Sequence, residues 1–114
     1  MFLQALCVLI ATQTLPRGIV GQEAPSLQGV EWIQTVERTA PAIEKGNVNY
    51  FFFFQSWCPG CHSHGFPTLQ KLEEKFPTVN FIAVQPVFEG FSTNTKERAV
   101  VDVKSFGLDI PVGH

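Results

Sequence analysis

The sequence predicts an α/β fold in which a central β-sheet is flanked by helices. From residue 48 onward, segments typical of strands alternate with segments typical of helices, in the order 48–55, 59–76, 78–88 and 94–107. A strand, a helix and a second strand in succession form a unit with two parallel strands and a right-handed crossover. A pair of cysteines falls where the first of these strands ends and the first helix begins.

The strand expected at 48–55 reads VNYFFFFQ. A continuous aromatic run bounded by turn residues is typical of a central strand that is buried on both faces. The helix expected at 59–76 carries apolar side chains at helical spacing, which should share one face: Phe66, Leu69, Leu72 and Phe76. Pro67 lies inside this helix and predicts a kink or a break, because proline cannot donate a backbone hydrogen bond.

The second strand, 78–88, alternates and is rich in β-branched residues, and Pro86 limits its far end. The second helix is expected to begin at Asn94, because an asparagine followed three residues later by Glu97 is typical of a helix start. Gly107 is expected to end this helix, since glycine readily adopts the left-handed conformation that closes many helices.

Composition bounds the class of protein. The chain has 114 residues, of which 45% are hydrophobic and 16% charged, so it can form one small domain with a core of its own. Its net charge is −2 and it has no basic run. The sequence therefore lacks the cluster of basic residues that binding to nucleic acid or to an anionic membrane surface requires.

Residues 1–17 form an apolar N-terminal segment, and residues 18–114 are assigned to one domain. The apolar stretch is too short to span a membrane, which takes ~20 apolar residues. Its length suits the apolar region of a secretory signal peptide, but no Lys or Arg precedes it and no A-x-A cleavage site follows. Two locations stay open: periplasmic or extracytoplasmic if the segment is a signal peptide, and cytoplasmic otherwise.

The chain has three cysteines, of which Cys58 and Cys61 form a C-x-x-C pair and Cys7 lies far away in the apolar segment. Cys58 is expected at the N-terminus of a helix, where free N–H groups and the helix dipole favour an anion. Its pKa should therefore be lowered, which makes it the natural nucleophile. Cys61 lies one helical turn further on and is the natural resolving thiol.

Four neighbours are expected to shape this site. Pro59 fits the first turn of a helix, where its missing N–H has no consequence, and Gly60 completes the motif. Trp57 can shield the pair and offer an apolar docking surface. His62 can tune the pair, because a nearby imidazolium stabilises a thiolate.

Other chemistries also fit the motif. C-x-x-C-H is an attachment site for c-type haem, with His62 as one axial ligand and His64 or His114 as the other. Zinc could bind Cys58, Cys61, His62 or His64, although a structural zinc site needs a second pair of ligands that the sequence lacks. Two inert, buried cysteines are the simplest alternative.

The segment FFFFQSWCPGCHSHGFPTLQKL, residues 51–72, resembles the active-site segment of thioredoxin-fold thiol–disulfide oxidoreductases and is most similar to the TlpA-like redoxins. The segments GQEAPSLQ (21–28) and FIAVQPVFEG (81–90) resemble other parts of that group, within the alkyl hydroperoxide reductase/thiol-specific antioxidant superfamily. The resemblance covers about residues 20–112. It implies an enzyme that exchanges electrons with protein thiols and disulfides through Cys58 and Cys61, with no metal or organic cofactor. The oligomeric state stays open.

The sequence departs from the redoxin pattern at several points. Pro67 is the tenth residue of the motif rather than the ninth, so one extra residue is expected to form a bulge in the helix. Phe52 stands where thioredoxin has a buried acid, so the proton of Cys61 must leave through water or another group. Pro111 is a candidate for the cis-proline of the family. The closing hairpin and last helix are expected to be missing after His114.

A peroxide reductase of the peroxiredoxin type is the alternative within the superfamily. Such enzymes usually carry Thr or Ser three positions before the reactive cysteine. Here that position is Gln55. The dithiol interpretation is therefore preferred to the peroxidase.

Overall fold

The computed structural model describes residues 20–36 and 41–114. The apolar segment 1–17, with Cys7, lies outside the described residues, and so does the boundary expected after residue 17. Within the described part of the chain, every helix is too short or too polar to span a lipid bilayer.

Four strands form one mixed sheet in the order β1-β4-β3-β2: β1 (Trp32–Gln34), β2 (Asn49–Phe53), β3 (Asn80–Val84) and β4 (Val112–Gly113). β2, β3 and β4 are mutually parallel in that order, and β1 runs antiparallel to β4. In the register of the first parallel pair, Phe53 lies opposite Val84. The parallel pair expected from the strand–helix–strand pattern is therefore confirmed.

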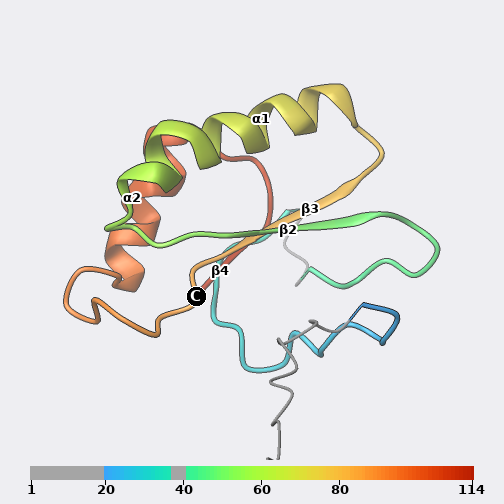
Figure 1. The fold of residues 1–114 in the computed structure, drawn as a ribbon, viewed down its shortest axis with the longest axis horizontal. Coiled ribbons are helices and arrows are strands. Elements are labelled where there is room, and N and C mark those ends of the chain that lie inside the picture. Colours follow the sequence, from blue (N-terminus) through green and yellow to red (C-terminus); the bar gives the residue numbers. More distant parts are fainter. Residues whose placement is uncertain (1–19, 37–40) are drawn as a thin grey trace, which may run out of the picture.

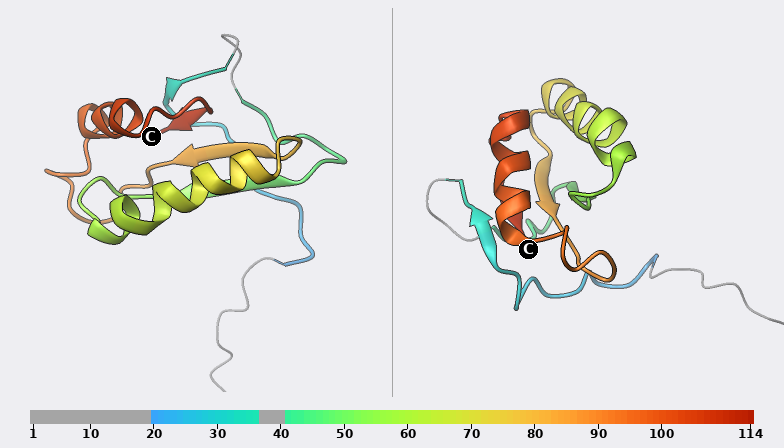
Figure 2. Two further views of the ribbon diagram at one scale, coloured as in Figure 1. Left: turned by 90° about the horizontal axis from the view of Figure 1, so that it is seen from above. Right: turned by 90° about the vertical axis from the view of Figure 1, so that its left-hand side faces the viewer.

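Both α-helices lie on the same side of this sheet (Figure 1). α1 (Phe66–Lys75) connects β2 to β3, and α2 (Lys96–Phe106) connects β3 to β4. Two successive right-handed crossovers that step in one direction place both helices on one face. The two helices pack through stacked rings of Phe66 and Phe106, whose centroids are 4.3 Å apart. Figure 2 shows the same layering from two further directions.

β2 is an edge strand of the described sheet, so the expectation of a central strand buried on both faces is wrong. Side chains alternate across a strand, and the phenylalanine run is divided accordingly. Phe52 and Phe54 face the helices, with centroids 5.1 and 5.0 Å from that of Phe66. Phe51 and Phe53 stack on each other on the opposite face, and Phe53 is 61% exposed. An aromatic run thus predicted the strand but not its place in the sheet.

The helix after β2 begins with a π-helical turn, η1 (Cys61–Gly65), which continues directly into α1. This is the bulge expected from the extra residue in the motif, and Pro67 follows it in the first turn of α1, where its missing N–H is tolerated. The wide turn brings Gly65 against the ring of Phe52. A Cβ atom at Gly65 would lie 2.7 Å from Phe52 Cζ, so any larger residue must displace that ring.

The N-cap of α2 lies one residue later than the expected Asn94. The cap is Thr95, whose Oγ1 accepts a hydrogen bond from Arg98 N, and Asn94 makes other contacts. Gly107 ends the helix at φ 59°, ψ 40°, in the left-handed conformation that the sequence predicted. Asn94 does not cap the helix, because its side chain accepts a hydrogen bond from Trp57 N and donates one to the carbonyl of Glu89.

Two strands, β1 and β4, were not expected from the sequence. They are too short for a periodic pattern, and they are held by reciprocal backbone hydrogen bonds between Glu31 and His114, of 2.9 and 2.8 Å. The Ile110–Pro111 bond is trans, because the described residues contain no cis peptide. Pro111 is therefore not a cis-proline here. Its carbonyl instead accepts a hydrogen bond from Ala83 N and joins β4 to β3.

We expect Gly65→Ala to destabilise the domain by about 1–3 kcal/mol, because the added methyl group must displace the ring of Phe52. Gly60→Ala is the matched control. Gly60 has helical backbone angles, and the nearest atom to its added Cβ would be Cys58 Sγ at 3.9 Å. Urea unfolding of both variants gives the two free energies. Equal stability of the two variants would contradict the close packing of the π turn.

Candidate active site

The two cysteines lie at the carboxyl end of β2, where the chain turns from the sheet into the helix. A turn closes with a hydrogen bond from Cys58 N to the carbonyl of Gln55, at 3.0 Å. Cys61 N then donates to the carbonyl of Cys58 at 3.1 Å, within the first helical turn. Pro59 and Gly60 already have helical structure. The predicted strand–helix junction is thus present, with both thiols free and one turn apart.

The two thiols are electrostatically different. The pKa of Cys58 lies below its ordinary value, chiefly because the Cys61 thiol donates a hydrogen bond to it, with further donation from the backbone N–H groups of Cys61 and Gly60. Burial raises the pKa of Cys61. At a given pH the thiolate fraction is therefore larger for Cys58. A thiolate at Cys58 beside a partly buried thiol at Cys61 suits a nucleophile and a resolving group.

Trp57 is fixed at the mouth of the site although its side chain is 48% exposed. Its backbone N–H donates to Asn94 Oδ1 at 3.0 Å, and its indole N–H donates to Gln55 Oε1 at 2.7 Å. The amide of Gln55 also donates to the carbonyl of Pro86. These bonds tie the residue before Cys58 to the loop that follows β3.

The buried side-chain amide of Gln85 bonds the turn that precedes Cys58. Gln85 is 1% exposed, and its Oε1 accepts a hydrogen bond from Ser56 N at 2.6 Å. Its Nε2 donates to the carbonyl of Thr95 at 3.1 Å. Sequence reasoning missed Gln55, Gln85 and Asn94. One signal was present: Gln85 directly follows β3 and Gln55 lies two residues after β2, and the carboxyl ends of parallel strands meet at one edge of a sheet.

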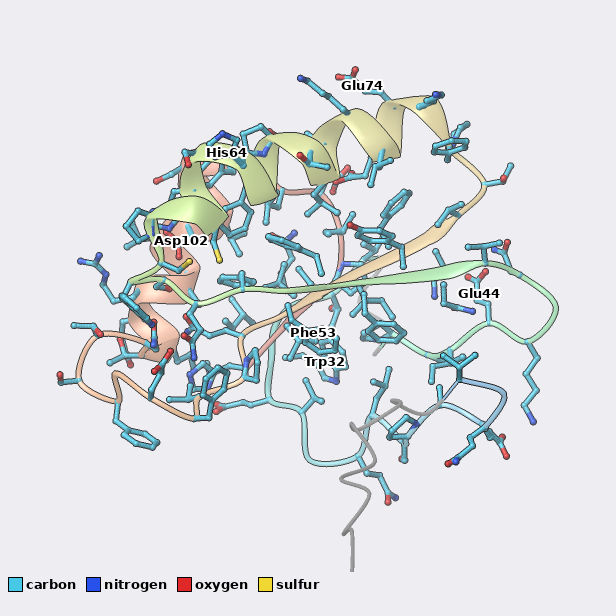
Figure 3. All side chains as sticks on the ribbon, in the orientation of Figure 1. Trp32, Glu44, Phe53, His64, Glu74 and Asp102 are labelled. Atoms are coloured by element: carbon cyan, nitrogen blue, oxygen red, sulfur yellow. The ribbon has the colours of Figure 1, made fainter. Side chains whose placement is uncertain are left out.

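His62 approaches a carboxylate that the sequence analysis also missed. Its Nε2 lies 3.1 Å from Oδ1 of Asp102, which projects from α2. The imidazole ring lies beside the stacked pair of Phe66 and Phe106, with its centroid 5.8 Å from each of theirs. Figure 3 shows Asp102 beside the yellow sulfur atoms of the pair. Helical spacing could have revealed it, because Asp102 shares the apolar face of α2 with Ala99.

The other two histidines contact other groups. His64 is exposed and its Nδ1 contacts Ser63 Oγ at 2.7 Å, while His114 Nε2 lies 3.3 Å from the carbonyl of Asn94. Nowhere in residues 20–36 and 41–114 do three His, Cys, Asp or Glu side chains converge as metal ligands. The zinc alternative therefore gains no support from this part of the chain.

Comparison with known proteins gives three relatives, although no protein-family model matches the chain. The thiol:disulfide interchange protein DsbE homologue of Paracoccus denitrificans (strain Pd 1222) is 33% identical over 63 residues, which cover 55% of this chain and 35% of that protein. A thiol-disulfide isomerase from Corynebacterium glutamicum is 31% identical with a TM-score of 0.61, over 74% of this chain and 57% of that one. A thioredoxin-like superfamily protein is 33% identical with a TM-score of 0.56, over 60% of this chain and 46% of that one.

The chain therefore has a thioredoxin-like fold, and two of these relatives are thiol–disulfide interchange or isomerase proteins, as the resemblance implied. The assignment to the TlpA-like group within them stays a prediction. The chain spans about a third of the curated relative and about half of each structural relative.

The hydrogen bond from Cys61 predicts how the Cys58 pKa responds to substitution. We expect Cys61→Ala to raise the pKa of Cys58, because the main donor to the thiolate is lost. Cys61→Ser keeps an O–H donor and should raise the pKa less. Ultraviolet absorbance of the thiolate against pH, in a Cys7→Ser background, measures both variants. Since a higher pKa delays ionisation, the Ala variant should ionise at higher pH. Identical titrations would contradict the assigned cause.

Proposed function

We propose that this domain catalyses thiol–disulfide exchange with protein partners, with Cys58 as the nucleophile and Cys61 as the resolving thiol. The observation that carries the proposal is the asymmetry of the pair. Cys58 is accessible with a lowered pKa, and Cys61 is partly buried with a raised pKa, one helical turn away. The kinship with thiol–disulfide interchange and isomerase proteins supports the same reaction.

The geometry supports a two-step exchange. The Cys58 thiolate attacks one sulfur of a partner disulfide, which breaks the partner's S–S bond, and the released partner thiolate takes up a proton. Cys61 then loses its proton and attacks Cys58 Sγ. The mixed disulfide breaks, a Cys58–Cys61 disulfide forms, and the second partner sulfur leaves as a thiolate. Two electrons pass from the dithiol to the partner, and the reverse sequence oxidises a partner dithiol.

Apolar side chains beside the pair suit a protein partner. Trp57 is half exposed, and the loop that touches it carries Phe88 and Phe91, exposed by 69% and 70%. Contact between this loop and Trp57 is close, because a Cβ at Gly90 would lie 3.4 Å from Trp57 Cδ1. An extended polypeptide with apolar residues beside its disulfide would cover this surface. The partner class is therefore a protein thiol or disulfide.

Turnover with a protein disulfide tests the proposal. With dithiothreitol as reductant, we expect the chain to accelerate the reduction of insulin, followed by turbidity. Cys58→Ser should abolish the acceleration because the attacking sulfur is lost. Cys61→Ser should instead accumulate a mixed disulfide between Cys58 and insulin, visible by non-reducing electrophoresis. Cys7→Ser is the control and should keep full activity.

Two results would contradict the proposal. One is equal insulin reduction by the wild type and Cys58→Ser. The other is a wild type without reductase activity whose Cys58 alone consumes hydrogen peroxide, which would favour the peroxidase alternative.

A further inference from the structure

We propose that Asp102 is the proton acceptor for Cys61 and that His62 connects its carboxylate to solvent. This inference rests on the proposed exchange reaction, because only the resolving step requires Cys61 to lose its proton. Neither residue belongs to the C-x-x-C motif, and Asp102 reaches the site from a different helix.

Cys61 needs a proton acceptor. Its sulfur is partly buried, and burial favours the protonated thiol. A protonated thiol is a poor nucleophile. The proton of Cys61 must therefore leave as Cys61 attacks the mixed disulfide. Phe52 on β2, which stands where thioredoxin has a buried acid, is a hydrocarbon ring and offers no acceptor. A side chain on the helices is therefore the candidate for this role.

Asp102 has the burial and the free oxygen that this role requires. The residue is 7% exposed, and its Oδ2 is buried without a hydrogen-bond partner among the described residues. A buried carboxylate oxygen without a donor is unfavourable, and it keeps a lone pair ready to accept a proton. Asp102 is also near enough to Cys61 for its charge to disfavour the Cys61 thiolate.

His62 links the buried carboxylate to the surface. Its side chain is 35% exposed, whereas that of Asp102 is 10% exposed. His62 Nε2 lies 3.1 Å from Asp102 Oδ1, but the two atoms are not aligned for a hydrogen bond. The imidazole also packs beside the stacked rings of Phe66 and Phe106, which restricts its position. An imidazole so placed can pass a proton between carboxylate and water.

Few titratable groups surround this route. Among the described residues, those that act on Cys61 are Cys58 on the same turn and Asp102 on α2. From the loop after β3, Glu89 acts on Cys58 and opposes its ionisation. In the proposed step, the proton of Cys61 passes to the Asp102 carboxylate as the Cys61–Cys58 S–S bond forms. The partner sulfur leaves with the electron pair of the broken mixed disulfide.

The test separates a proton acceptor from a mere negative charge, because the two roles predict opposite effects of Asp102→Asn. Loss of the charge alone would lower the pKa of Cys61 and speed its attack. Loss of a proton acceptor would slow the attack. A reaction with 5,5′-dithiobis(2-nitrobenzoate) in a Cys7→Ser background reports both thiols. The first coloured thiolate is released by Cys58, and the second by attack of Cys61 on the mixed disulfide.

For Asp102→Asn at pH 7 we expect an unchanged first phase and a second phase slowed at least about tenfold. The second phase should recover as the pH rises, because hydroxide then removes the proton. His62→Gln should slow the second phase less. Asp109→Asn is the control: it removes the same charge at an exposed residue beside Glu73 and should change neither phase.

A second phase that is unchanged or faster in Asp102→Asn, with the native circular dichroism spectrum retained, would overturn the inference and leave the exchange reaction standing. Absence of a second phase in the wild type would instead contradict the proposed function itself. The two failures are therefore distinguishable in one experiment.

Discussion

The packing of Phe66 against Phe52 and Phe54 is the contact on which the site depends. This packing fixes the start of α1 over the end of β2. The ring centroid of Phe66 lies 5.1 Å from that of Phe52 and 5.0 Å from that of Phe54. Between these two anchors the chain must turn and begin a helix within a few residues. The π turn of η1 accommodates the extra residue of this stretch, and Gly65 lets the turn approach the ring of Phe52. The cysteine pair is held in the space that this packing defines.

Buried amides, rather than charges, hold the other side of the turn. Gln85 and Asn94 each bond a backbone N–H immediately before Cys58, at Ser56 and Trp57 respectively. A buried backbone N–H without a partner is costly, so these two side chains favour one conformation of the turn. That rigidity holds the two thiols in different environments. The hydrogen bond from Cys61 lowers the pKa of Cys58, whereas burial raises the pKa of Cys61.

Much of this arrangement was predictable from local sequence. Strand and helix periodicity predicted β2, α1, β3 and α2, and the shifted Pro67 predicted the bulge that is observed as η1. The place of β2 at the sheet edge was not predictable, because a strand's neighbours are set by the tertiary structure and not by its own side chains. Asn94 was misassigned as a cap for a related reason, since its actual partner, Trp57, lies 37 residues away. Asp102 was missed because a single acid on a helix is usually taken as solvated.

The redox equilibrium of the Cys58–Cys61 pair tests the central claim most directly. The chain, in a Cys7→Ser background, would be equilibrated in glutathione buffers of graded ratio, and its free thiols counted by alkylation and mass spectrometry. A single dithiol–disulfide couple predicts that both thiols disappear together with one midpoint and a mass loss of two hydrogens. Independent oxidation of the two cysteines, or oxidation of Cys58 alone to sulfenic acid, would contradict the account.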